Sequence, residues 1–403
     1  MNDYEVYGAL FLLAAGATYL LTFPVARLAK KAGVVDEPDE RRVHTRTTPT
    51  VGGAAMLLAF LVAMIAASRV HNLDGIFQRS SEPLGIVLAA AVIFGVGLYD
   101  DIKEMSAPAK MAGQVLAAAA LFLLGVTMYH FKIPFAGFLI LSPQLTPLLT
   151  ALWVIVIANA VNFIDGLDGL AAGVVAIAAG TLCVYGLRLE TLGVLPADNI
   201  GPLIAAVTCG VCVGFLPHNF HPARIFMGDA GALLIGLLMA VSTMVIGGRT
   251  TDVSGQTYFF FAPLFLPFFI LGVPALDAAL AIVRRTASRS SLARPDIDHL
   301  HHRLLRLGHG HRRAVVILWA WTAILCGFVL FPTFDPRTNA YIPFGVAALG
   351  VALYTLFHPG IRQKPTAQAG DATTPTDAPG QGGGTPEDTA SGRFAVADEE
   401  VPG

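Results

Sequence analysis

Runs of about 20 mostly apolar residues recur along most of the chain, and this pattern limits its fold more than any other feature. A chain with 55% hydrophobic and only 13% charged residues, and a mean hydropathy of +0.64, does not fit two soluble domains of the same total length. We predict an all-α polytopic membrane protein with about 11 transmembrane helices. Their expected ranges are 6–27, 50–67, 83–99, 109–128, 145–162, 168–187, 201–217, 230–247, 259–283, 314–332 and 340–358.

The distribution of basic residues between the two sides of these spans predicts the orientation. Nineteen of the 26 Lys and Arg fall on one side and six on the other, with Arg393 in the far tail left out. Because basic residues gather in cytoplasmic loops, we expect the N-terminus outside and the C-terminus in the cytoplasm. We expect an integral membrane domain over 1–359 and a cytoplasmic tail over 360–403, whose Gly, Pro, Thr, Ala and Asp content predicts disorder.

The stretch NAVNFIDGLDGLAAG, residues 159–173, places four polar side chains between two strongly apolar runs. On a helix, residues three apart are neighbours, but the row drifts by about 60° at each step, so four together require an irregular helix end. Two glycines within the stretch supply that irregularity. Since carboxylates at a membrane boundary are costly, we interpret the stretch as a functional site. Its polar members are Asn159, Asn162, Asp165 and Asp168.

Two adjacent acids end the third expected span. Asp100 and Asp101 stand in GVGLYDDIKEM, followed by Lys103. Adjacent residues on a helix diverge by about 100°, so the two carboxylates should serve different partners. Neighbouring carboxylates raise one another's pKa, which suits a general base, and their oxygens suit magnesium. The alternative is a helix end followed by a solvated charged turn.

Asp229 lies just before an apolar helix in LPHNFHPARIFMGDAGALLIG. Aspartate is a favoured N-cap residue, so a purely structural role is a strong alternative. However, the residue is expected on the cytoplasmic side, and Gly228 and Gly231 leave the backbone bare enough for a ligand.

The longest internal cytoplasmic loop, 284–313, contains RPDIDHLHHRLLRLGHGHRR. Leucines at helical spacing between Pro295 and Gly308 predict one short amphipathic helix on the membrane surface. Its His and Arg side chains favour phosphate oxygens, and contact with anionic lipid is the alternative. The spacing matches no zinc-finger or metalloprotease pattern. The polar face carries His299, His302, Arg303 and Arg306.

All these groups are expected at the cytoplasmic ends of different spans, whereas scattered ion pairs would face both sides. Oxygen ligands beside a cationic loop suggest a magnesium-dependent reaction between a phosphorylated soluble donor and a lipid acceptor. A transporter would place polar residues near the membrane midplane, which is nearly bare of them here. A lipid or nucleotide transporter and a non-catalytic scaffold are the rival classes.

At these residues the sequence resembles the polyprenyl-phosphate N-acetylhexosamine-1-phosphate transferases of glycosyltransferase family 4. That family includes the bacterial undecaprenyl-phosphate N-acetylglucosamine-1-phosphate transferase and phospho-N-acetylmuramoyl-pentapeptide transferase. The matching pieces occur in the family's order and cover about residues 30–305. They are DEPDERRVH with VGG at 36–53, YDD at 99–101, NAVNFIDGLDGLAAG at 159–173, FMGDAG at 226–231 and DHLHH at 298–302.

The resemblance implies transfer of a sugar 1-phosphate from a UDP-sugar to a polyprenyl phosphate, undecaprenyl or decaprenyl, with release of UMP in a bacterial cell membrane. It implies Mg²⁺, with Mn²⁺ as the substitute, bound by Asp229 and Asn162. It assigns proton abstraction to Asp100, with Asp101 and Lys103 positioning the lipid phosphate. The remaining residues it implies are Asp165 and Asp168 for the nucleotide and metal site, and Asn159, His299, His301, His302 and Arg303 for substrate.

The compact DHLHH piece resembles the N-acetylglucosamine branch of the family. The muramoyl-pentapeptide branch usually carries a triple histidine followed by aromatic and acidic residues, whereas Arg303 and Leu304 follow His302 here. We therefore expect UDP-N-acetylglucosamine as donor, with the pentapeptide donor as the alternative. The substrates and the bilayer are the expected partners, nucleic acid is not, and both a monomer and a homodimer stay open.

Overall fold

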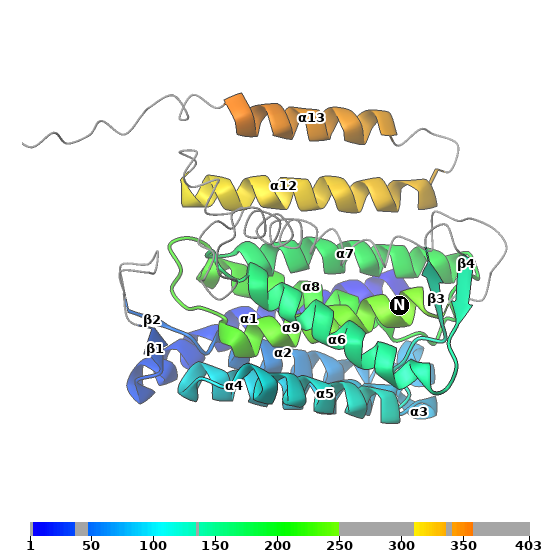
Figure 1. Cartoon of the computed structure of the whole chain (residues 1–403), viewed down its shortest axis with the longest axis horizontal. Helices are drawn as coiled ribbons and strands as arrows, with labels where there is room; N and C mark the ends of the chain where they lie inside the picture. Colours follow the sequence, from blue (N-terminus) through cyan, green and yellow to red (C-terminus); the bar gives the residue numbers. More distant parts are fainter. Residues whose placement is uncertain (1–2, 37–46, 134–136, 250–309, 336–340, 358–403) are drawn as a thin grey trace, which may run out of the picture. The chain divides into compact units, whose positions relative to one another are not determined.

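The computed structural model describes residues 3–36, 47–133, 137–249, 310–335 and 341–357, all within one compact unit, Met1–Gln363. Most of these residues are helical (Figure 1). The first helices are α1 (Asp3–Ala32), α2 (Gly52–Ala67), η1 (His71–Leu73), α3 (Asp74–Arg79), α4 (Glu82–Lys103) and α5 (Ala107–Leu123). The later ones are α6 (Leu145–Ile164), α7 (Leu170–Thr191), α8 (Gly201–Asn219), α9 (Gly228–Gly247), α12 (His311–Leu330), η2 (Phe331–Thr333) and α13 (Tyr341–Phe357).

Strands in the described ranges form two short antiparallel pairs. β1 (Val35–Asp36) pairs with β2 (Thr48–Pro49), and β3 (His130–Ile133) pairs with β4 (Gly137–Ile140). Segment 129–144 is too short and too interrupted by proline to cross a membrane, which predicts a hairpin or a re-entrant piece. The β3–β4 pair shows that it is a hairpin.

Seven of the described helices are long and apolar enough to cross a membrane. The number is eight if α2 and the short helices after it, which bend by 95°, form one broken span. Helices α5 and α13, with 17 residues each, are shorter than these spans. The chain is therefore a multi-pass membrane protein, while the number of 11 and the orientation of the termini stay predictions. The expected span 259–283, the surface helix in 284–313 and the tail lie outside the described residues.

Helix α9 lies at the centre of the bundle, with α2, α4, α6 and α8 packed around it, and nearly all its residues are buried. Small residues allow the backbones to touch. A Cβ atom on Gly97 of α4 would overlap the Cα of Ala230, and one on Gly53 of α2 would overlap the backbone of Gly231. This close approach places the end of α4 directly against the start of α9.

The chain direction alternates through the bundle, so one end collects the motif residues. Helices α4, α6 and α8 end there, and α2, α5, α7, α9 and α12 begin there (left in Figure 1). We call this the carboxylate end, and the end that carries the β3–β4 hairpin the hairpin end. The acids that define the carboxylate end are Asp100, Asp101, Asp165, Asp168 and Asp229.

Candidate active site

Lys110, near the start of α5, joins two acids of the carboxylate end. Its Nζ lies 2.8 Å from Oδ2 of Asp100, at the end of α4, and also donates to Oδ2 of Asp229, in the first turn of α9. The side chains of Lys110 and Asp100 are 16% and 15% exposed, whereas that of Asp229 is 35% exposed. The backbone N–H of Met105 donates to Oδ1 of Asp100 at 2.5 Å. Asp229 is thus the more accessible carboxylate of the pair.

Asp101 uses both carboxylate oxygens to hold the start of α9. The backbone N–H of Asp229 donates to Oδ1 at 2.8 Å, and that of Ala230 donates to Oδ2 at 3.1 Å. A carboxylate there satisfies N–H groups that have no partner within the helix and interacts favourably with the helix dipole. Asp229 is not the N-cap residue of α9, so the alternative that it caps this helix is wrong, although it does lie in the first turn, where the helix dipole favours an acid. Its carboxylate is left to face Lys110 and Asn162.

The two asparagines of α6 have different partners. Asn162 donates through Nδ2 to Oδ1 of Asp229 at 2.9 Å, and no described residue donates to its amide oxygen. Asn159, one turn earlier, exchanges hydrogen bonds of 2.5 and 3.2 Å with the buried amide of Gln114 on α5. The structure therefore brings Asn162 to Asp229 and uses Asn159 to join α5 to α6.

Asp165 directly follows α6, where the chain leaves helical geometry. Helix α7 begins at Leu170, directly after Gly169. The φ of +79° at Gly169 lies in the left-handed region, which favours glycine, so this residue supplies the irregular helix end that the sequence predicts. Part of Asp165 reaches the surface, but its carboxyl group is densely surrounded. This burial, together with nearby carboxylates, Asp229 foremost, raises the pKa of Asp165 to about 8. No described residue donates a hydrogen bond to its side chain.

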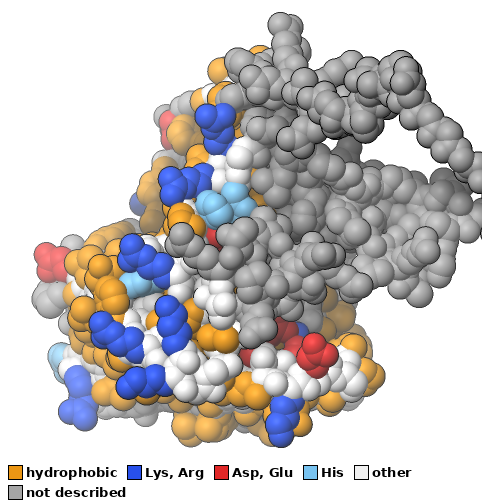
Figure 2. All heavy atoms as spheres, turned by 90° about the vertical axis from the view of Figure 1, so that its left-hand side faces the viewer, with side chains coloured by type: hydrophobic (Ala, Val, Ile, Leu, Met, Phe, Trp, Pro, Cys, Tyr) orange, Lys and Arg blue, Asp and Glu red, His pale blue; other side chains and the backbone are white. Residues whose placement is uncertain are grey.

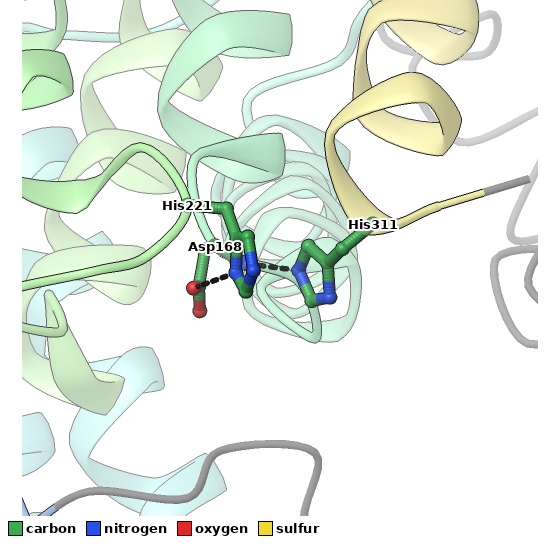
Figure 3. Close-up of side chains that lie close together, drawn as sticks. All are labelled: Asp168, His221 and His311. Atoms are coloured by element: carbon green, nitrogen blue, oxygen red, sulfur yellow. Dashed lines mark hydrogen bonds and ion pairs between the residues drawn. The ribbon is translucent and has the colours of Figure 1, made fainter.

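Asp168 meets two histidines that the sequence predictions did not include (Figure 3). Nδ1 of His221, in the loop between α8 and α9, lies 2.7 Å from Oδ2 of Asp168. The backbone N–H of Asp168 donates to Nε2 of His311, the first residue of α12, at 3.2 Å. The two imidazole rings stack with centroids 4.2 Å apart and planes 17° from parallel. Three separate segments of the chain therefore converge at Asp168.

Lys103 was expected to position the lipid phosphate near Asp100, and this role stays a prediction, while the lysine that contacts Asp100 in the structure is Lys110. Lys103 is exposed and its Nζ lies over the ring of Tyr99, 5.8 Å from the centroid, while Lys110 contacts Asp100. A signal for Lys110 was present, because a cation in the first turn of an apolar helix faces an unfavourable dipole and needs an acidic partner. His221 lies five residues before the FMGDAG piece, and His311 lies in the basic loop 284–313. Both segments are expected on the cytoplasmic side, and this was the signal for the two histidines.

The remaining predicted residues, His299, His301, His302 and Arg303, lie outside the described residues. Figure 2 looks onto the carboxylate end, and on the described part of this face Lys and Arg side chains are spread over the surface with histidine and acidic side chains between them. A surface of this kind attracts anions, while the carboxylates beneath it offer oxygen ligands to a cation.

Comparison with known proteins places the chain in a family. The family described as glycosyl transferase family 4 matches residues 83–247. Decaprenyl-phosphate N-acetylglucosaminephosphotransferase of Mycobacterium tuberculosis is 41% identical over 85% of this chain and 86% of its own length. The probable undecaprenyl-phosphate N-acetylglucosaminyl 1-phosphate transferase of Bacillus subtilis is 33% identical over 79% of this chain and 81% of its own length. Phospho-N-acetylmuramoyl-pentapeptide-transferase of Mycolicibacterium smegmatis is 30% identical over 78% of this chain and 93% of its own length.

These relatives cover most of the chain at 30% identity or more, so the chain belongs to glycosyl transferase family 4. The resemblance carried by the five motifs is thereby confirmed.

Proposed function

We propose that this protein transfers N-acetylglucosamine 1-phosphate from UDP-N-acetylglucosamine to decaprenyl or undecaprenyl phosphate in a bacterial cell membrane. The product would be a lipid-linked pyrophosphate sugar that begins a cell-wall or surface polysaccharide. The relative named for decaprenyl phosphate and N-acetylglucosamine shares 41% identity, against 30% for one named for the muramoyl-pentapeptide. The structural observation that carries the proposal is the single ammonium of Lys110 between Asp100 and Asp229 at the end of a membrane bundle.

In the proposed reaction an oxygen of the lipid phosphate attacks the phosphorus that carries the sugar. The bond from this phosphorus to the bridging oxygen breaks, and UMP leaves with the electron pair. Both reactants are anions, so positive charge and orientation are what the protein has to provide. Lys110 supplies a buried positive charge, and Asp100, within 2.8 Å of it, is our candidate for accepting a proton from the lipid phosphate.

Asp101 has a different part in this proposal. Both of its oxygens accept hydrogen bonds from backbone N–H groups of α9, whereas Asp100 gives one oxygen to the ammonium of Lys110. It positions the first turn of α9 and thereby Asp229. This division of work between two adjacent acids fits the expectation that their side chains point to different partners.

The residues around Asp229 fit a magnesium ion, with Mn²⁺ as the substitute. The carboxylate of Asp229 is partly exposed, and the amide oxygen of Asn162 receives no hydrogen bond from the described residues, so hard oxygen ligands are at hand. When bound, the ion would neutralise charge on the diphosphate of the donor. Asn162 would hold Asp229 in place through its Nδ2, and Asp165 and Asp168 would face the nucleotide.

Purified full-length protein, given magnesium, decaprenyl phosphate and UDP-N-acetylglucosamine, tests this function. We expect UMP release together with a lipid-linked pyrophosphate sugar. A parallel reaction with the UDP-muramoyl-pentapeptide donor should release little UMP. A preference for the pentapeptide would assign the chain to the other branch, and flux of nucleotide or lipid into vesicles without UMP would make it a transporter.

A further inference from the structure

The histidine and carboxylate group at residues 168, 221 and 311 offers ligands of a different chemistry from the oxygen groups around Asp229. Asp168, His221 and His311 each present one ligand atom, and these atoms lie within 4.8 Å of one another (Figure 3). All three residues are partly buried, and they come from the α6–α7 loop, the α8–α9 loop and the first turn of α12. A single small ion could therefore contact three segments that are distant in sequence.

The hydrogen bonds in the group show which nitrogen lone pairs are available. A backbone N–H can only donate, so the bond from Asp168 N–H to His311 means that Nε2 of His311 carries a lone pair and no proton. Asp168 has an outer support as well, because the backbone N–H of Ala223 donates to Oδ2 at 3.1 Å. Supported ligands of this kind are typical of sites that bind metal.

We propose that Asp168, His221 and His311 form a binding site for a divalent transition metal ion, such as Zn²⁺ or Co²⁺, separate from the oxygen site at Asp229. Two imidazoles and one carboxylate suit these ions, whereas magnesium prefers oxygen ligands only. Three protein ligands leave a fourth position for water. The inference does not depend on the proposed transferase activity.

Metal uptake requires a small change in the group. Two ligands at about 2.0–2.1 Å from a tetrahedral ion lie about 3.3 Å apart, whereas Nδ1 of His221 and Oδ2 of Asp168 are 2.7 Å apart. The ion therefore replaces the proton of this hydrogen bond, and the stacked rings open. His221 has room to turn, because 36% of its side chain is exposed. The nearby guanidinium of Arg312 donates to the backbone oxygen of His221 and leaves the ring free.

A bound ion would join the start of α12 to the α6–α7 loop and to the α8–α9 loop. Occupation of the site should therefore raise the thermal stability of the full-length protein, because an ion that binds only the folded state stabilises it. The present contacts between these segments include the hydrogen bond from Asp168 to His311, the His221–Asp168 pair and the stack of the two imidazole rings.

Cobalt titration of the full-length protein in detergent, treated with chelator and then kept in excess Mg²⁺, tests the proposal. We expect one Co²⁺ equivalent with visible ligand-field absorption that His221→Gln and His311→Gln both weaken by at least about tenfold. The matched control is His71→Gln, since His71 pairs with Asp74 at 2.6 Å on the surface without a second imidazole. Equal affinity and stoichiometry in the wild type and all three variants would overturn the site.

A measurement on the unaltered protein covers the case in which the glutamine variants do not fold. Diethyl pyrocarbonate modifies accessible imidazoles, and peptide mass spectrometry locates each modified histidine. Zn²⁺ should protect His221 and His311 from modification and leave His71 reactive. Unchanged modification of His221 and His311 at saturating Zn²⁺ would contradict the proposal.

Discussion

Each end of the helical bundle contains a buried ion pair, and the two pairs are built differently. At the hairpin end Arg249 donates to Glu82, to the carbonyl oxygen of Gly125 at 2.7 Å and, through Nε, to that of Thr127 at 2.9 Å. Its guanidinium also lies over the ring of Tyr129. Here one cation meets one anion, and the donors of the guanidinium are used by the surrounding backbone.

At the carboxylate end one ammonium serves two acids. Lys110 bonds both Asp100 and Asp229, so two carboxylates share one positive charge. Negative charge is therefore in excess, which costs stability unless a ligand compensates it. The side chains of Glu82 and Arg249 are more buried than those of Lys110, Asp100 and Asp229. The balance of positive and negative charge, and not burial alone, therefore distinguishes a structural ion pair from a candidate functional site.

The largest effect on activity should come from removing the charge of Asp229, the more accessible of the two acids that share Lys110. Asp229→Asn should lower turnover by about 10³-fold, because it removes the charge of the carboxylate that we propose as a metal ligand while leaving the side-chain shape unchanged. UMP release at increasing magnesium concentration measures this. The control is Asp198→Asn, which changes an exposed acid elsewhere on the chain. Wild-type magnesium dependence in Asp229→Asn would remove the ligand assignment.

A smaller effect should separate the two lysines near Asp100. Lys110→Met should lower turnover by about 100-fold, since it deletes the one described cation that bonds Asp100 and Asp229. Lys103→Met removes an exposed charge and should change turnover by less than about threefold. Steady-state rates of the two variants, corrected for folded protein, test the distinction. A larger loss in Lys103→Met than in Lys110→Met would support the expectation that Lys103 positions the lipid phosphate.

The ion pair of the hairpin end should respond in stability and not in activity. Glu82→Gln leaves a buried guanidinium without its counter-charge, and we expect a loss of about 3 kcal/mol, visible as a lower melting temperature. Asp74→Asn is the matched control, because it breaks an exposed histidine–aspartate pair, where little is lost. If Glu82→Gln lowered the rate per folded molecule, the contrast between the two ends would fail.

The smallest effect concerns the protonation of Asp165. Its pKa is about 8 in the folded protein, against an ordinary aspartate value of 3.8, so the folded protein holds a proton that the unfolded chain has lost. Stability from this group therefore falls as pH rises from about 4 to about 8 and is level above that. Asp165→Asn should gain up to about 2 kcal/mol relative to the wild type between pH 6 and pH 8. Melting temperatures at both pH values, with Asp198→Asn as control, measure the difference.

Much of the fold follows from hydrophobic periodicity, because a long apolar run has few alternatives to a helix. Each expected span that falls in the described residues contains a helix, including 83–99 in α4 and 230–247 in α9. Helix ends were less predictable. Helix α1 extends to Ala32, five residues past the expected end of its span, because a helix continues beyond the apolar segment wherever its backbone bonds stay satisfied.

In the site, Asn162 and Asp229 could be placed on the same side from the sequence, and the structure joins them by a hydrogen bond. The role of Asp101 could not be foreseen, since it depends on the close approach of Gly97 to Ala230, a contact between segments more than 100 residues apart. The choice of Lys110 over Lys103 likewise depends on how α5 packs against α4. Spacing along one helix carries no information on such contacts.

The two bonds from Asp101 to the start of α9 have a mechanical consequence. Together with the backbone contact at Gly97, they make the end of α4 and the start of α9 move as one piece. A displacement of one helix should carry the other with it, so we expect Asp100 and Asp229 to stay close together when the bundle shifts. We therefore expect any opening that admits a long lipid to occur elsewhere around the site, where the ammonium of Lys110, which contacts the two acids only through side-chain hydrogen bonds, can move away.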